Sequence, residues 1–398
     1  MAAPTSAPTR RARVFGTGGT FPINAPCAAE TARNRALYPH LLSEGRVGGF
    51  AVRNRIVMAP LTRARSPDTV PNALNVEYYR QRAGAGMIIS EATAICLQGT
   101  GAYKGPGLYD ERQVAGWQNV TSAVHAQGGL IIAQLWHAGR MAHPDFLPDG
   151  LWPVSSSAIT ADAIVATPNG RQHLVKPRQL EAAEIEEIPG RYAAAAKAAV
   201  DAGFDGVELH GANGYLIDQF LRSCANERTD GWGGTIAKRC RFLFEVAAAV
   251  AAVAGPQKTG VRLSPTSPIG DMQDENPLAL YTHAVRGLDD LSIGYLHIVE
   301  GNTSGEPQAE DRILTQALRR SFKGDVIVNN GYDLDTAEDA IADGMATAVS
   351  FGRPFIANPD LPARARQGLP LAAVNRATLY IDGETGYTDY PAAGGATS

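Results

Sequence analysis

The stretch GVELHGANGYLIDQF, residues 206–220, decides the fold class, because it carries an apolar strand directly into polar side chains. Residues 206–209 are typical of a strand that is buried on both faces. His210, Asn213 and Tyr215 then follow within six residues. Parallel α/β folds have this arrangement, because their functional residues lie at the carboxyl ends of buried strands. We therefore interpret the stretch as a strand that ends at a functional site.

Segments of the same two kinds alternate along most of the chain. Short apolar runs are followed by longer segments with helical periodicity. The predicted strands lie near residues 55–60, 86–92, 130–137, 206–211, 260–265, 295–301, 325–331 and 348–353. The predicted helices lie at residues 75–83, 110–126, 189–202, 239–254, 277–288, 314–321, 335–342 and 359–367. Eight strand and helix units of this kind predict an α/β fold that is a single (β/α)8 TIM barrel.

The barrel is predicted to occupy residues 37–390. The longest interruption, residues 138–188, follows the third strand and is rich in Pro, Ser, Asp and Gly. Because it also contains alternating apolar runs, we expect a capping insertion over one end of the barrel rather than a disordered loop. Residues 391–398 are expected to be a flexible tail.

The first 36 residues differ in composition from the rest of the chain. They include Arg10, Arg11 and Arg13, and no acidic residue precedes Glu30. We expect a disordered N-terminal extension and a cytoplasmic protein. The alternative is an organelle transit peptide, which would direct the protein to a plastid or a mitochondrion.

The overall composition favours a protein that binds small molecules. The formal net charge is -4, whereas nucleic-acid or membrane-surface partners favour a basic face. No apolar run approaches the roughly 18 residues that a membrane span needs. Cys27, Cys96, Cys224 and Cys240 lack the spacing of a zinc or iron-sulfur site, so we expect no metal. We expect a monomer or a homodimer.

The pair His210 and Asn213 carries the most specific chemistry at the strand ends. A neutral imidazole and a carboxamide three residues apart can both donate hydrogen bonds to one substrate oxygen. Tyr215 adds a phenol that can deliver a proton. The alternative is that His210 is a capping or core histidine and that Tyr215 is an ordinary packing aromatic.

Other strand ends suggest a phosphate-bearing cofactor. Asn330 and Gly331 follow the seventh strand and Gly352 and Arg353 follow the eighth, where barrels often bind phosphate. Arg262 on the fifth strand allows two interpretations, a ligand contact or an internal ion pair with a carboxylate such as Glu208 or Glu300. Gln134 is likewise either a ligand contact or a satisfied interior amide.

Five motifs together resemble one family, the old yellow enzymes, which are FMN-dependent ene-reductases. The motifs are NRIVMAPLTRARS, AQLWHAGR, GFDGVELHGANGYLIDQFLRSCANERTDGWGG, VRLSP and FGRPFIANPDL, followed by LYIDGETGYTDYP. The resemblance spans about residues 37–390. It implies noncovalent FMN, NADPH or NADH as donor, and ping-pong hydride transfer to activated alkenes. Such alkenes are α,β-unsaturated aldehydes and ketones, nitroalkenes and maleimides.

The resemblance also implies roles for individual residues. The FMN-binding residues would be Pro60, Leu61, Thr62, Ala92, Gln134, Arg262, Asn330, Gly331, Gly352 and Arg353. His210 and Asn213 would bind the substrate oxygen, Tyr215 would donate the proton, and Trp136 and Tyr380 would shape the pocket. Ala237 and Lys238 depart from the Glu-Asn pair typical of relatives, at the start of a helix without a catalytic role.

Three alternatives to an ene-reductase of this family differ in what they require. A two-domain iron-sulfur reductase would need clustered cysteines, which are absent from this sequence. A flavin-free aldolase or isomerase barrel would need a catalytic lysine or carboxylate, for which only Glu91 and Glu300 stand at strand ends. A non-catalytic flavin-binding or ligand-sensing barrel would keep the phosphate site at Arg353 without requiring Tyr215.

Overall fold

The computed structural model describes residues 37–148, 150–303 and 305–393, so the predicted extension at 1–36 and residues 394–398 of the predicted tail lie outside the described residues. Eight strands form the barrel: β3 (Ile56–Met58), β4 (Met87–Ile89), β6 (Ile131–Trp136), β11 (Gly206–Gly211), β12 (Thr259–Leu263), β13 (Tyr295–Val299), β14 (Asp325–Asn329) and β15 (Ala348–Phe351). All neighbours in this order pair in parallel, and β15 pairs with β3 to close the ring. The predicted (β/α)8 barrel is confirmed.

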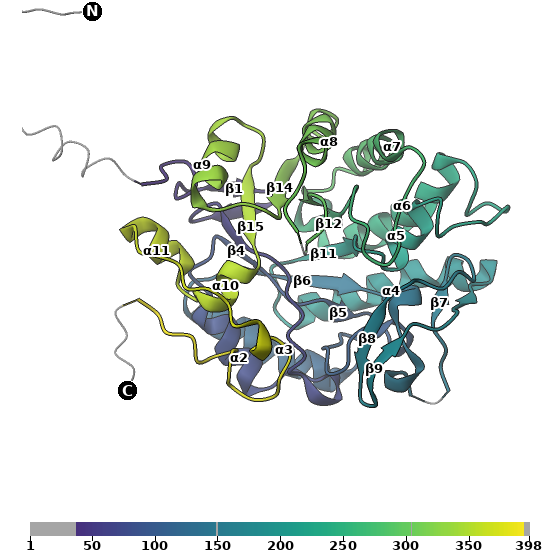
Figure 1. Ribbon diagram of the computed structural model, residues 1–398, viewed down its shortest axis with the longest axis horizontal. Coiled ribbons are helices and arrows are strands. Elements are labelled where there is room, and N and C mark those ends of the chain that lie inside the picture. The colour runs from purple at the N-terminus through teal and green to yellow at the C-terminus, as the bar shows by residue number, and fades with distance from the viewer. Residues whose placement is uncertain (1–36, 149, 304, 394–398) are drawn as a thin grey trace, which may run out of the picture. The chain divides into compact units, whose positions relative to one another are not determined.

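Helices surround the strands (Figure 1). Those that match the predicted units are α2 (Ala73–Gln81), α3 (Glu111–Ala126), α4 (Ala182–Asp201), α6 (Ile236–Ala254), α7 (Pro277–Asp290), α8 (Ala309–Arg320), α9 (Leu334–Ala342) and α11 (Leu361–Gln367). Two short helices were not predicted, α5 (Leu216–Leu221) and α10 (Arg353–Ala357). Within the described part, no helix has the length and apolar character needed to cross a bilayer.

Helix α4 begins seven residues earlier than predicted, because Pro189 lies inside it rather than at its start. The Glu184 carboxylate accepts the N–H of Glu181 at 2.8 Å and so caps the true N-terminus. Proline removes one helical hydrogen bond. Ile185 and Tyr192 are fully buried on the same helix, so packing holds the turn that proline weakens.

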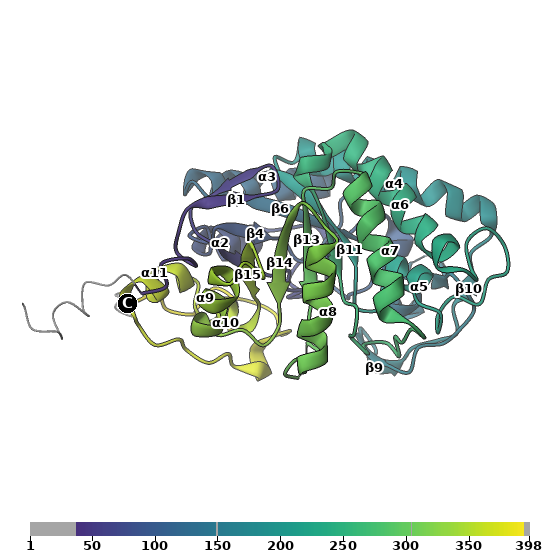
Figure 2. The ribbon, with the colours of Figure 1, turned by 90° about the horizontal axis from the view of Figure 1, so that it is seen from above.

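The N-terminal end of the barrel is closed by a hairpin that the sequence did not reveal. Strands β1 (Gly45–Val47) and β2 (Phe50–Val52) pair antiparallel, and Val47 and Phe50 pack in one apolar cluster with barrel side chains such as Met87. A Cβ at Gly206 would lie 2.5 Å from the ring of Phe50, so only glycine fits there. Figure 2 shows strand β1 of this hairpin at one end of the barrel and strand β9, which belongs to the insertion after β6, at the opposite end.

The predicted capping insertion is confirmed, although it ends near residue 181 rather than 188. Its strands are β7 (Val154–Ser155), β8 (Ile164–Thr167), β9 (Gly170–His173) and β10 (Arg178–Gln179). Strands β8 and β9 form an antiparallel hairpin, and β7 pairs in parallel with β10. Leu174, just after β9, packs in one cluster with Trp136 at the carboxyl end of β6. Strand β5 (Thr93–Ala94) extends the same edge by pairing with β6.

Strand register brings polar side chains to one level inside the barrel. His210 on β11 pairs with Arg262 on β12, and Arg262 pairs with His297 on β13. Successive residues of a strand point to opposite faces, so every second residue of these strands shares the interior. The interior is therefore apolar near the hairpin and polar towards the carboxyl ends of the strands.

Candidate active site

A cavity of about 850 Å³ opens at the carboxyl ends of the barrel strands. This volume is typical of a small-molecule site. The predicted site residues that line it are Pro60, Leu61, Thr62, Asn213, Tyr215, Arg262, Asn330, Gly331, Gly352, Arg353 and Tyr380. The structure thus brings together residues from the ends of β3, β11, β12, β14 and β15 and from the C-terminal segment.

Asn213 and Tyr215 reach the cavity on a tight turn after β11. Asn213 and Gly214 have φ angles of 56° and 80°, and the N–H of Tyr215 donates to the carbonyl of Ala212 at 3.3 Å. Positive φ at both central residues is the condition for a type I′ turn, for which Asn-Gly is the preferred pair. We call this segment the Asn213–Gly214 turn. It projects the carboxamide and the phenol into the cavity wall.

Three aromatic rings pack together beside this turn. The ring of Tyr215 lies edge-on to His210 at 4.7 Å and to Trp136 at 4.6 Å between centroids. Burial, with a smaller contribution from Tyr380, raises the pKa of Tyr215 to about 12, so the phenol keeps its proton. Burial also holds the pKa of His210 well below its ordinary value, so the imidazole is neutral.

Three buried polar atoms near the cavity lack hydrogen-bond partners within the described part of the chain. Nδ1 of His210, Oδ1 of Asn213 and Nε1 of Trp136 are buried and make no hydrogen bond there. Leaving a buried polar atom unpaired is costly, so each such group calls for an explanation. Nδ1 of His210 bonds to no backbone group among the described residues, so this atom does not have the capping role that the alternative required.

Arg262 does not form the direct ion pair with Glu208 or Glu300 that was one of its two interpretations from the sequence. Its Nη1 donates to Nε2 of His297 at 2.5 Å, and its Nη2 donates to Oδ1 of Asn329 at 2.8 Å. His297 donates from Nδ1 to Glu208 at 2.9 Å, so the carboxylate is reached through the imidazole. Nε of Arg262 is buried without a partner among the described residues.

These contacts belong to a buried chain of side chains under the cavity floor, which we call the barrel-interior network: Gln134, Glu208, Arg262, His297, Asn329 and Ser350. Burial would raise the pKa of Glu208, but His297 and Arg262 hold it below its ordinary value. Burial lowers the pKa of His297 to about 4 and that of Arg262 to about 10. At neutral pH the network therefore contains a carboxylate, a neutral imidazole and a guanidinium.

A second guanidinium, that of Arg353, also lines the cavity. Arg353 donates from Nη2 to the carbonyl of Thr303 at 3.3 Å, and both residues line the cavity. Nδ2 of Asn330 donates to the carbonyl of Glu300 at 2.7 Å, so the side-chain amide holds the neighbouring loop. A Cβ at Gly352 would lie 3.4 Å from Leu61. A small side chain would therefore also fit at this position.

The remaining predicted residues, Ala92, Gln134, Trp136 and His210, do not line the cavity. The side-chain amide nitrogen of Gln134 has a hydrogen-bond partner inside the barrel, because Nε2 donates to Glu208 at 2.8 Å. Ala92 packs behind the wall in the apolar cluster of Trp136. Neither Glu91 nor Glu300, the two carboxylates named for a flavin-free barrel enzyme, lines the cavity; the carboxylates that do line it are Glu306 and Asp333.

Two sets of site residues were missed by sequence reasoning. His297 and Ser350 lie within apolar strands. The signal that could have found them is strand register, because His297 pairs with Arg262 and Ser350 pairs with Asn329 on the neighbouring strand. Residues 371–374 and 376 of the C-terminal segment also line the cavity, and no periodicity marks them. In the described part of the chain, no group of three or more His, Cys, Asp or Glu side chains could hold a metal ion.

Comparison with known proteins identifies the family. The sequence pattern of the NADH:flavin oxidoreductase / NADH oxidase family matches residues 46–372. A probable flavin mononucleotide-dependent alkene reductase of Leishmania infantum is 43% identical over 352 residues, which are 87% of this chain and 95% of that protein. The solved structure of an old yellow enzyme homologue from Zymomonas mobilis is 43% identical, with a TM-score of 0.86 over 89% of this chain and 99% of that one.

A structure of morphinone reductase in complex with tetrahydroNAD is also 43% identical, with a TM-score of 0.84 over 89% of this chain and 98% of that one. These matches cover most of the barrel and confirm the resemblance that the sequence motifs indicated. The predicted cofactors, FMN and NAD(P)H, are confirmed with it. The chain belongs to the old yellow enzyme family of FMN-dependent oxidoreductases.

Proposed function

We propose that this enzyme reduces the C=C bond of alkenes activated by a carbonyl or nitro group, and that NAD(P)H and the alkene occupy one site in turn. One observation carries the proposal. Beside the cavity, the imidazole of His210 and the carboxamide of Asn213 form no side-chain hydrogen bond within the described residues, and the phenol of Tyr215 lies against that imidazole. Two donors and a proton source gathered at the carboxyl end of β11 suit an enone better than a metabolite without a polarised double bond.

The cavity suits FMN. Flavin is a flat ring with an anionic phosphate, and the cavity is lined by two guanidinium groups, Arg262, whose buried Nε has no partner among the described residues, and Arg353, which follows Gly352. A cation near the flavin pyrimidine stabilises the negative charge of its reduced form. We assign Arg262 to the flavin ring, with the hydroxyl of Thr62 beside it, and Arg353 with the Gly331 and Gly352 backbones to the phosphate. Bound there, FMN would supply hydride-transfer chemistry, in which two electrons and a proton from NAD(P)H would pass to the alkene β-carbon.

His210 and Asn213 are assigned to the substrate oxygen. Because the pKa of His210 lies well below its ordinary value, the imidazole is a neutral donor and does not protonate the oxygen outright. The Asn213 side chain can donate from Nδ2 without breaking any hydrogen bond to the described residues. Two hydrogen bonds to the oxygen draw electron density from the double bond and expose the β-carbon to reduction.

Tyr215 is assigned to the proton that the α-carbon requires. Its raised pKa of about 12 keeps the phenol protonated throughout the neutral range. The ring is fixed between Trp136 and His210, at 4.6 and 4.7 Å between centroids, so its hydroxyl has a defined position in the cavity wall. A positioned acid of this kind contributes about 10² to 10⁴ in rate.

The test uses the purified holoenzyme under anaerobic conditions. We expect a yellow protein whose flavin absorbance is bleached by NADPH and restored by 2-cyclohexen-1-one. Bleaching by NADPH without recovery on adding a series of enones, nitroalkenes and maleimides would indicate the non-catalytic flavin-binding or ligand-sensing alternative. A phenol such as 4-chlorophenol should bind the oxidised enzyme and give a long-wavelength absorbance band, and Asn213→Gly should weaken that binding while keeping a residue that tolerates positive φ.

A further inference from the structure

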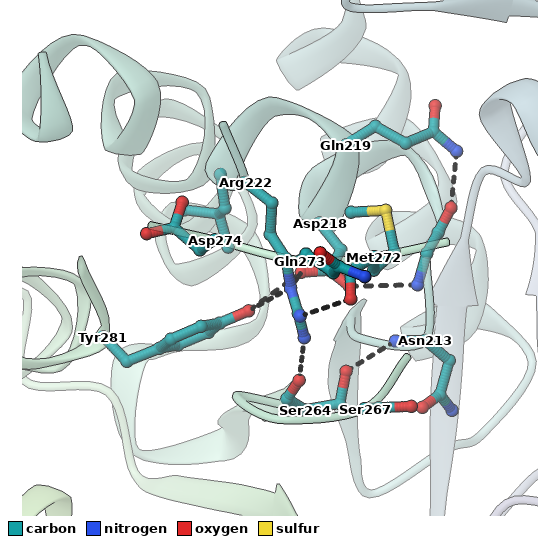
Figure 3. Close-up of polar contacts among 12 residues, drawn as sticks. Asn213, Asp218, Gln219, Arg222, Ser264, Ser267, Met272, Gln273, Asp274 and Tyr281 are labelled. Atoms are coloured by element: carbon teal, nitrogen blue, oxygen red, sulfur yellow. Dashed lines mark hydrogen bonds and ion pairs between the residues drawn. The ribbon is translucent and has the colours of Figure 1, made fainter. Parts of the chain in front are cut away.

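The Asn213–Gly214 turn is bound on both sides by buried side chains that do not themselves reach the cavity. The N–H of Asn213 donates to Oγ of Ser264 at 2.7 Å, and the N–H of Gly214 donates to Oδ2 of Asp218 at 2.9 Å. The carbonyl of Gly214 accepts from Nε2 of Gln219 at 2.6 Å. Figure 3 shows these side chains gathered around the turn. Ser264, Asp218 and Gln219 are fully buried and do not line the cavity.

Arg222 joins two of these partners into a closed ring of interactions. Its Nε donates to Oδ1 of Asp218 at 3.1 Å, and its Nη2 donates to the carbonyl of Ser264. Tyr281 on α7 donates from its hydroxyl to the same Asp218 oxygen at 2.9 Å (Figure 3). Burial would lower the pKa of Arg222, but Asp218 and Tyr281 raise it, so the guanidinium stays charged. The ring links α5 to the end of β12 across the turn.

This ring holds a backbone conformation that few residues other than Asn and Gly adopt. Asn213 and Gly214 are both in the left-handed region, at φ 56° and 80°, and non-glycine residues there are disfavoured. Each of their two N–H groups is held by a different buried oxygen, and these oxygens come from different elements. Rotation of either peptide plane would break a buried hydrogen bond, which is costly. The side chains of Asn213 and Tyr215 flank the Asn213–Gly214 peptide, whose N–H donates to Asp218.

We propose that Ser264 and Asp218 are positioning residues for substrate reduction, which act through Asn213 and Tyr215. The inference rests on the proposed function, because it assumes that Asn213 binds the substrate oxygen and that Tyr215 donates the proton. Ser264 fixes the peptide that carries the Asn213 carboxamide. Asp218, with Arg222 and Tyr281, fixes the Asn213–Gly214 peptide, one peptide before Tyr215. Neither side chain touches the substrate.

The main test is Ser264→Ala in the FMN-loaded enzyme. It removes one hydrogen bond from the N–H of Asn213 without burying a charge. We expect the Kd for 4-chlorophenol, measured from the long-wavelength absorbance band, to rise about 2- to 10-fold, the range for one net hydrogen bond. The rate at which 2-cyclohexen-1-one reoxidises the reduced enzyme should fall by a similar factor. Reoxidation by molecular oxygen, which needs neither Asn213 nor Tyr215, should stay within twofold.

A second variant acts from outside the turn. Tyr281→Phe keeps the buried ring but removes the hydroxyl that donates to Asp218 and accepts from Arg222 at 3.0 Å. The ratio of the rate of reoxidation by 2-cyclohexen-1-one to the rate of reoxidation by oxygen should fall, as for Ser264→Ala, but by a smaller factor. The matched control is Ser157→Ala. Ser157 is buried, and its Oγ accepts the N–H of Glu227 at 3.0 Å in the capping insertion, so the same kind of bond is lost elsewhere.

Two results would overturn the inference. One is that Ser264→Ala and Tyr281→Phe leave phenol binding and the rate ratio within twofold of wild type, while Asn213→Gly and Tyr215→Phe change them. The other is that the alkene and oxygen rates fall in parallel, which is the mark of general structural damage. If Asn213→Gly and Tyr215→Phe also have no effect, the proposed function itself fails, so the two failures are distinguishable.

Discussion

The two ends of the barrel differ in what their buried side chains accomplish. At the N-terminal end, Val47 and Phe50 of the β1–β2 hairpin complete an apolar cluster with the lower barrel residues. At the carboxyl end, buried polar atoms of His210, Asn213 and Arg262 remain without partners among the described residues, next to a cavity of about 850 Å³. The same eight strands therefore supply stability at one end and binding groups at the other.

This difference separates the expected effects of substitutions. At the closed end, a truncated side chain leaves a void in a packed cluster, so stability falls and the site is unchanged. At the open end, a polar group without protein partners stabilises little, so its removal changes chemistry rather than folding.

Tyr215→Phe should have the largest effect, and only on catalysis. Removing the phenol should slow reoxidation by 2-cyclohexen-1-one about 10² to 10⁴-fold, the usual contribution of a positioned acid. Flavin reduction by NADPH should stay near normal, because that step needs no proton from this residue. Stopped-flow absorbance separates the two steps. An equal loss in both steps would argue against the assignment of Tyr215 as proton donor.

Phe50→Ala should have the opposite profile. Phe50 is 5% exposed and closes the N-terminal end against barrel side chains. The free energy of unfolding should fall by about 3 to 5 kcal/mol, the usual cost of truncating a buried phenylalanine. At a temperature where the variant is folded, both half-reactions should keep their wild-type rates. Urea denaturation together with stopped-flow kinetics checks this, and slower alkene reduction in folded protein would show that the two ends are coupled.

The eight strands could be predicted because each is an apolar run followed by a helical segment. The cavity residues could be predicted where a family motif carries them, as for Asn213 and Arg353. The closing hairpin could not, since β1 and β2 are three residues each and their role depends on contacts with distant strands. Helix α5 follows the turn directly and, at six residues, is too short for periodicity to show.

The barrel-interior network was hidden for a different reason. His297 stands in the apolar run YLHIV, which reads as a buried strand and gives no sign of a charged partner. Its link to Arg262 and Glu208 appears only when strand register places three strands side by side. The predicted start of helix α4 was wrong because proline usually begins a helix. Here the packing of neighbouring residues holds Pro189 in the interior of the helix.

Acid sensitivity should arise at the polar end. The pKa of His297 is lowered to about 4, so below the ordinary histidine value the unfolded chain binds protons that the folded protein does not. This contribution to stability is fully present above about pH 6.5 and is lost as pH falls towards 4. His297→Gln should reduce the difference in unfolding free energy between pH 7 and pH 5 by about 2 kcal/mol. Urea denaturation at both pH values measures it, and an unchanged difference would contradict a neutral buried imidazole.

Tyr380→Ala should have the smallest effect. The residue lines the cavity but is 68% exposed, so its loss should change the free energy of unfolding by no more than about 0.5 kcal/mol. The backbone beside it should keep its place, because Arg65 donates to the carbonyls of Thr378 and Leu379 at 3.1 and 2.9 Å. We therefore expect KM for bulky enones to change by roughly 2- to 5-fold, about what 0.4 to 1 kcal/mol of binding amounts to, with the rate of flavin reduction unaltered. Steady-state kinetics with cyclohexenones of increasing ring substitution test this. A loss of stability larger than that of Phe50→Ala would mean that the open end also carries the fold, and the contrast between the two ends would then fail.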